Sequence, residues 1–84
     1  MSSMDIYRKK VNNMMYDLIR IHKLIVEAEE LSDKILKLED FMRCDKFNNN
    51  LTAMQQHLLT EQYDIMRDYL TVLLRRIYNM NEEN

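Results

Sequence analysis

The chain has 84 residues, of which 46% are apolar; it contains neither glycine nor proline, and its net charge is −2 at neutral pH. This length allows one small domain, and the composition excludes disorder, glycine-rich phosphate loops, tight hairpin turns and the basic surface of a general DNA or RNA binder. The single cysteine excludes an internal disulfide and suits a reducing cytosol. No apolar run approaches the ~20 residues of a membrane span, and none forms a secretion leader.

We therefore predict an all-α protein with one domain, residues 1–84. Residues 1–10 are expected to form a short leading helix or arm. The pair Asn12 and Asn13 marks a break after this arm, because asparagine is a poor helix former that tolerates the left-handed conformation. A helix that continues through both asparagines is the alternative.

A long helix is predicted over residues 11–43, because apolar residues recur there every three or four positions. Its first half carries unusually few polar groups. Between residues 14 and 26 the polar positions are Asp17, Arg20, His22 and Lys23. A helix that is apolar nearly all round is buried on all sides, and one returning helix cannot cover it. We therefore expect other copies of the chain to cover this half in a homo-oligomer.

The remaining segments complete an antiparallel two-helix hairpin. Residues 44–51 are predicted as a loop in which Phe47 packs back onto Phe41 or Leu51. A second helix is expected over residues 52–80, with Thr52 as N-cap and Gln55 three positions later in a capping box. Residues 81–84 form a polar tail.

The sequence contains no pattern typical of an enzyme. The serine and threonine hydroxyls have no convergent base near them in sequence, as nucleophilic catalysis requires. His22, His57 and Cys44 do not have the spacing of metal ligands. We predict no catalytic residues, no bound metal and no cofactor.

Charge is distributed unevenly along the chain. Residues 5–23 hold five basic and two acidic side chains, net +3, whereas residues 27–40 hold six acidic and two basic ones, net −4. The basic region has two interpretations: a solvated face that keeps an oligomer soluble, or a site for a small anion. The candidate ligand-binding residues are Tyr7, Arg8, Lys10, Arg20 and Lys23.

The anion-site interpretation follows from how two copies would combine these groups. Arg20 and Lys23 are three positions apart and share a helix face, so a two-fold interface would present each cation twice, with Tyr7 adding two flat rings. A cyclic dinucleotide has two phosphates for the cations and two bases for the rings. Arg75 and Arg76 are candidates for a second anion site; for Arg76 the alternative is an interface salt bridge with an acid such as Asp17 or Glu27.

The hairpin also resembles a known family over roughly residues 27–78. The resemblance rests on the run 30–41, on Phe47 and Leu51, and on spaced positions of the second helix. These positions are Leu58, Leu59, Gln62, Met66, Tyr69, Leu73, Arg76 and Ile77. The pattern is similar to the hairpin domain shared by the phage anti-CBASS protein 2 family and the Thoeris anti-defence proteins.

This resemblance implies a function. Members of the family are sponges, not enzymes: they bind and sequester cyclic di- or trinucleotide immune signals as interlocked hexamers, in the cytoplasm of an infected bacterium. By position, the resemblance assigns base stacking to Tyr7 and phosphate contact to Lys23, with Tyr16 or Arg20 as alternatives. It connects Arg75 or Arg76 with a trinucleotide pocket. The competing hypothesis is a helical protein–protein interaction module that inhibits a host protein.

Overall fold

The computed structural model describes residues 3–82, and these form three helices joined by short connections. They are α1 (Ser3–Met42), α2 (Asp45–Asn50) and α3 (Ala53–Glu82). No strand occurs within the described part of the chain, and the predicted all-α class is confirmed. Of the expected polar tail, residues 83–84 lie outside the described residues, whereas α3 continues to Glu82.

Of the two alternatives at Asn12 and Asn13, the structure contains the continuous helix and not the break. Helix α1 runs without interruption through Asn12 and Asn13. An asparagine costs less than about 1 kcal/mol relative to alanine in a helix, and helix formation is cooperative along the chain. Two such residues are therefore insufficient to end a helix whose neighbours on both sides favour it.

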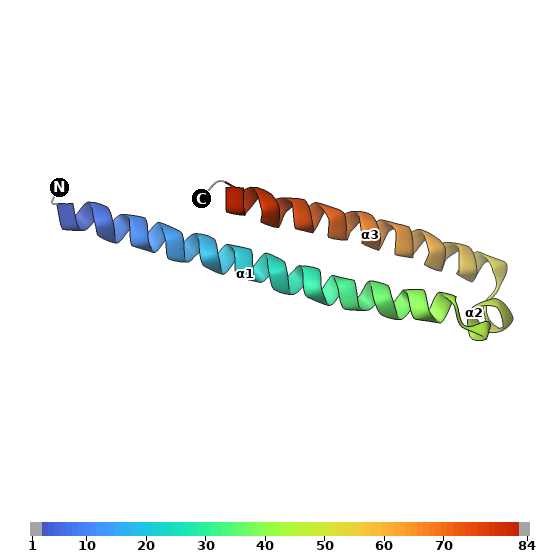
Figure 1. Ribbon diagram of the computed structural model, residues 1–84. Helices are drawn as coiled ribbons and strands as arrows, with labels where there is room; N and C mark the ends of the chain where they lie inside the picture. The colour runs from blue at the N-terminus through green and yellow to red at the C-terminus, as the bar shows by residue number, and fades with distance from the viewer. Residues whose placement is uncertain (1–2, 83–84) are drawn as a thin grey trace.

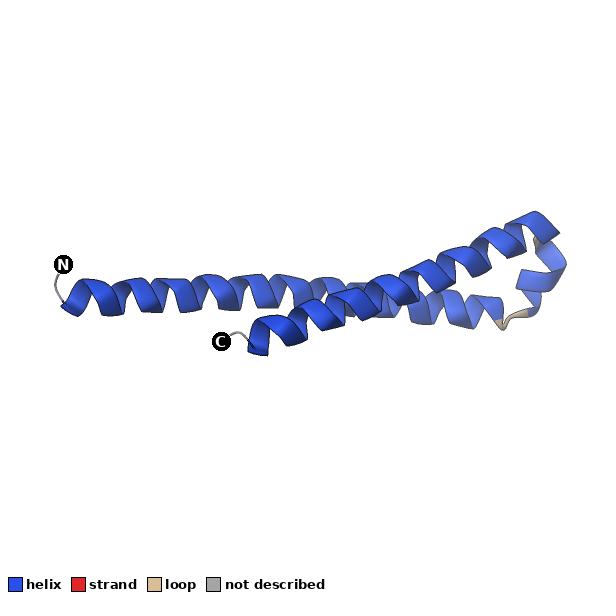
Figure 2. Cartoon of the chain, turned by 90° about the horizontal axis from the view of Figure 1, so that it is seen from above, coloured by secondary structure: helices blue, strands red, loops and turns tan. Residues whose placement is uncertain are grey.

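Helix α3 folds back along the second half of α1 (Figure 1), and the two helices cross at a shallow angle when seen from above (Figure 2). Helix α1 has 40 residues against 30 in α3, and its N-terminal part extends past the C-terminal end of α3 (Figure 1). We call residues 3–20 the overhang. The molecule measures 70 × 15 × 14 Å and has a radius of gyration of 20.2 Å, against about 12 Å for a compact domain of this length.

The core is a single narrow seam between α1 and α3. Leu73 is completely buried and packs against Leu24 and Ala28, which are 8% and 6% exposed. The small side chain of Ala28 allows α3 to approach α1 closely at this point. Partly buried residues that border the cluster are Leu31, Leu70, Ile77 and Met80. Each fully buried leucine contributes about 1.5–3 kcal/mol to the free energy of unfolding, so Leu73 anchors the hairpin.

The connection between the long helices is more ordered than the predicted loop over residues 44–51, because α2 lies within it. The Phe41 and Phe47 rings meet edge to face with centroids 6.2 Å apart, as the sequence predicted. The predicted capping box is also confirmed. The Gln55 amide donates to the Thr52 hydroxyl at 3.1 Å, and the Thr52 amide donates to the Gln55 side chain at 2.9 Å.

Two tyrosines of α3 connect the helices by hydrogen bonds to glutamates of α1. The Tyr63 hydroxyl donates to Glu39 over 3.3 Å, and the Tyr69 hydroxyl donates to Glu27. The bond to Glu27 raises the pKa of Tyr69, with smaller contributions from desolvation and from the negative charge of Glu27, while the positive charge of Arg76 lowers it in part. These bonds fix the register of α3 on α1.

Candidate functional site

The overhang exposes its side chains almost completely in a single chain. Every described side chain from residue 4 to residue 20 is exposed except that of Asp17, which is half-buried. The exposed groups include large apolar ones: Met14 and Leu18 are 64% and 63% exposed. Most of the predicted ligand-binding residues thus lie on a helix that no other part of the described chain covers.

One face of α1 holds two of the predicted cations and an aromatic ring. The guanidinium carbon of Arg20 lies 5.8 Å from the centroid of the Tyr16 ring, which is a cation–π contact. Lys23 lies seven positions after Tyr16, about two helical turns further along the same face. Arg20 and Lys23 are both exposed. This face, defined by Tyr16, Arg20 and Lys23, is the polar face.

The structure does not bring Tyr7 to Lys23 within one chain. The two residues are 16 positions apart on one continuous helix, which corresponds to about 24 Å along its axis and to nearly opposite sides of it. Arg8 and Lys10 are exposed near Tyr7. These three residues could therefore meet Arg20 and Lys23 only if they come from another copy. Tyr16 is the tyrosine that shares the face with both cations.

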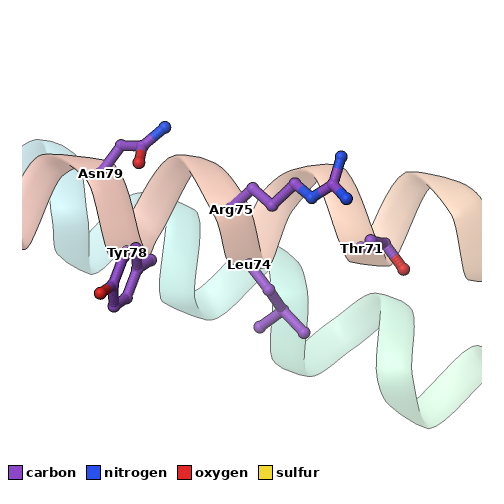
Figure 3. A pocket seen from close by; sticks show the side chains of 5 residues that line it. All are labelled: Thr71, Leu74, Arg75, Tyr78 and Asn79. Carbon is purple, nitrogen blue, oxygen red and sulfur yellow. The ribbon is translucent and has the colours of Figure 1, made fainter.

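Arg75 and Arg76 lie on different sides of α3. Arg75 borders a shallow depression with Thr71, Leu74, Tyr78 and Asn79, and Figure 3 shows it between Thr71 and Asn79 along the helix. Arg76 instead acts electrostatically on Tyr69 at the hydrogen bond to Glu27. Within the described residues of one chain the salt bridge joins Arg43 to Glu39, so a salt bridge of Arg76 with Asp17 or Glu27 across an interface stays a prediction.

The remaining polar candidates do not form a cluster. His22 and His57 are exposed on different helices, and Cys44 is an exposed free thiol. No three histidine, cysteine or acidic side chains of the described residues gather where they could hold a metal ion. None of the helices within residues 3–82 combines the length and apolarity needed to span a membrane.

The fold and the site together define a class: an elongated helical protein with a narrow core, a large exposed apolar surface and an exposed cation–aromatic face. The chain matches the Sequestin family over residues 19–79, and it belongs to that family, which is the family of anti-CBASS and Thoeris cyclic-nucleotide sponges that the hairpin resembles. The family is a sequestering one, and no catalytic family is indicated. No curated protein and no solved structure matches the chain.

The match agrees with the structural division of the molecule. Residues 19–79 comprise the hairpin with its seam, its capping box and its tip, and they include Arg20, Lys23, Arg75 and Arg76. Tyr7, Arg8 and Lys10 lie outside the matched range. The family assignment therefore supports a ligand role for Arg20 and Lys23 more directly than for the first part of the overhang.

Proposed function

We propose that the protein is a phage anti-defence sponge, which binds and sequesters cyclic oligonucleotide signals in the cytoplasm of an infected bacterium without cleaving them. The observation that carries this proposal is membership of the Sequestin family together with the exposed polar face. Sequestration blocks CBASS-type immunity because the bound messenger no longer reaches its receptor. Cyclic dinucleotides such as cyclic GMP-AMP are the first candidate ligands, and cyclic trinucleotides are the second.

The polar face supplies the two kinds of contact that such a ligand needs. Arg20 and Lys23 offer charged hydrogen-bond donors to phosphate oxygens, and an aromatic ring offers a stacking surface to a base. One copy presents half of the required groups, because a cyclic dinucleotide has two phosphates and two bases. A homo-oligomer, a hexamer by analogy with the family, provides the second half.

The stacking ring is either Tyr16 from the same face or Tyr7 from another copy. In the second case Arg8 and Lys10 accompany Tyr7 and add positive charge around the ligand. Alanine substitution decides between the two: the ring that stacks should lose about 1–3 kcal/mol of binding free energy when it is removed. The other substitution should leave the affinity nearly unchanged.

The test of the proposal combines binding with recovery of the ligand. Cyclic GMP-AMP is added to the protein in a calorimeter, and the complex is then heat-denatured and the supernatant analysed by chromatography. We expect tight binding, with a dissociation constant in the nanomolar range (about −12 kcal/mol), and recovery of intact cyclic GMP-AMP. A linear product would indicate a nuclease. Absence of binding by a panel of cyclic di- and trinucleotides at micromolar protein would refute the sponge.

A further inference from the structure

The overhang carries an apolar stripe on the side opposite its polar face. The residues of this apolar stripe are Met4, Tyr7, Val11, Met14 and Leu18. Their spacing of alternately three and four positions places them along one side of α1, and each is more than half exposed. A stripe of this length would be unfavourable in water, since contiguous apolar surface on soluble proteins usually marks a contact.

Beside the seam of the hairpin lies an open apolar groove. Its walls are Ile25 and Glu29 of α1 and Leu70, Leu74 and Ile77 of α3. A second, more polar depression shares Leu70 and Leu74 with it and extends it along α1 to Glu39. The whole groove therefore follows α1 from residue 25 to residue 39. The groove and the apolar stripe, which runs from residue 4 to residue 18, span the same number of residues.

The stripe and the groove are continuous with each other. Ile25 follows Leu18 by seven positions, so the line of the stripe enters the groove at Ile25. Helix α3 instead covers the side of α1 that bears Leu24 and Ala28. A longer α3 would therefore not cover the stripe, whereas a third helix lying in the groove and extending beyond it would.

We propose that this third helix is the overhang of a second copy, which lies antiparallel in the groove while the first copy's overhang lies in the groove of the second. The inference deepens the proposed function, on whose homo-oligomer it rests. Because the two contacts are identical, the arrangement closes with two-fold symmetry. Each copy then covers the apolar stripe that its partner cannot cover by itself.

Charge selects the antiparallel direction. In the register that sets Leu18 opposite the partner's Ile25, it places residues 5–16 of one copy, net +2, alongside residues 27–38 of the other, net −2. A parallel pair would place cations against cations and acids against acids. In the antiparallel register, Lys10 lies opposite the partner's Asp33. Opposite charges of this kind steer association and penalise the wrong orientation.

The arrangement has a consequence for the ligand site. Tyr7 belongs to the apolar stripe and is covered by the partner's groove, whereas Tyr16, Arg20 and Lys23 point away from this contact and stay accessible to a further copy of the homo-oligomer, which supplies the second set of groups for the ligand. The contact therefore predicts that Tyr16 is the stacking ring.

Disulfide trapping tests the register in the intact chain. In a Cys44→Ser background, Leu18→Cys is combined with Ile25→Cys, and mild oxidation is followed on a non-reducing gel. We expect a covalent dimer from this pair. The matched control combines Leu18→Cys with Leu58→Cys, which is also exposed but lies near the hairpin tip, and it should give none. Equal trapping in both pairs, or trapping by Leu18→Cys alone as in a parallel dimer, would overturn the proposal.

A second measurement does not depend on oxidation. Light scattering coupled to gel filtration should show a mass above the 10.3 kDa of one chain, and Leu18→Asp or Leu74→Asp should reduce it while circular dichroism stays helical. A monomeric parent chain would refute the contact. Since neither readout uses a nucleotide, a chain that assembles in this register but binds no nucleotide would refute the sponge alone.

Discussion

Tyr69 on α3 and Glu27 on α1 are joined by a hydrogen bond from the tyrosine hydroxyl to the carboxylate. The two residues lie next to the Leu73 seam, where Leu24 and Ala28 are buried. Arg76, seven positions or about two turns after Tyr69 along α3, places a positive charge near the pair. This group of side chains connects the register of the hairpin to its pH dependence.

The hydrogen bond predicts a loss of stability at alkaline pH. The pKa of Tyr69 is raised above its ordinary value of 10.0, mainly by the bond to Glu27. When the pKa of a group is higher in the folded than in the unfolded state, the group contributes its full stabilisation to the folded state at pH values below the unfolded-state pKa. This stabilisation is lost as the pH rises through the folded-state pKa. Urea denaturation of the parent chain and of Tyr69→Phe should therefore differ by a constant amount below about pH 10 and converge above it. A difference that stays constant to pH 12 would contradict this assignment.

Leu73 is expected to be the most sensitive core position. Its side chain is completely buried, and replacing a buried leucine with alanine costs about 2–5 kcal/mol. In so narrow a seam, Leu73→Ala should strongly lower the midpoint of thermal unfolding followed by circular dichroism. The matched control is Leu58→Ala on the same helix, because Leu58 is 54% exposed. Equal losses in the two variants would mean that the seam is not centred on Leu73.

The start of α3 depends on its capping box. Thr52→Ala removes the acceptor for the Gln55 amide and should cost about 1 kcal/mol of stability. Thr52→Ser keeps the hydroxyl and should restore most of it. Chemical denaturation of the three proteins measures the difference. A serine variant as unstable as the alanine variant would indicate that the threonine methyl group, and not the cap, stabilises this end.

Ligand affinity should depend on Lys23 and not on lysines in general. Removing one charged donor to a phosphate typically costs about 1.5–3 kcal/mol of binding free energy, which raises the dissociation constant about 10- to 150-fold. Calorimetry with cyclic GMP-AMP should show this loss for Lys23→Ala. Lys34→Ala removes an equally exposed lysine from the acidic segment of the same helix and serves as control. A similar weakening in both variants would attribute the effect to net charge.

Several features of the fold could be predicted from the sequence because they depend on neighbours along the chain. The helical spacing of apolar residues predicted the long helices, and Thr52 and Gln55 predicted the N-terminus of α3. The sequence left two alternatives open at Asn12 and Asn13, a break or a continuous helix, and the continuous helix forms because the cooperativity of the surrounding helix prevails over the low helix propensity of asparagine. The assignment of base stacking to Tyr7, with Tyr16 as the alternative, stays a prediction, because the resemblance aligns positions along the chain and does not consider which residues share a face.

The sequence by itself determined that the protein is helical, that its first long helix carries more apolar surface than a hairpin can bury, and that its two charged segments have opposite sign. These properties follow from residue type and period alone. Only the tertiary structure decided that Leu73 meets Leu24 and Ala28, that Tyr69 bonds to Glu27, and that Arg76 places its charge near this bond between the two helices. Such relations require the register of one helix on the other, and that register depends on how side chains far apart in sequence fit together.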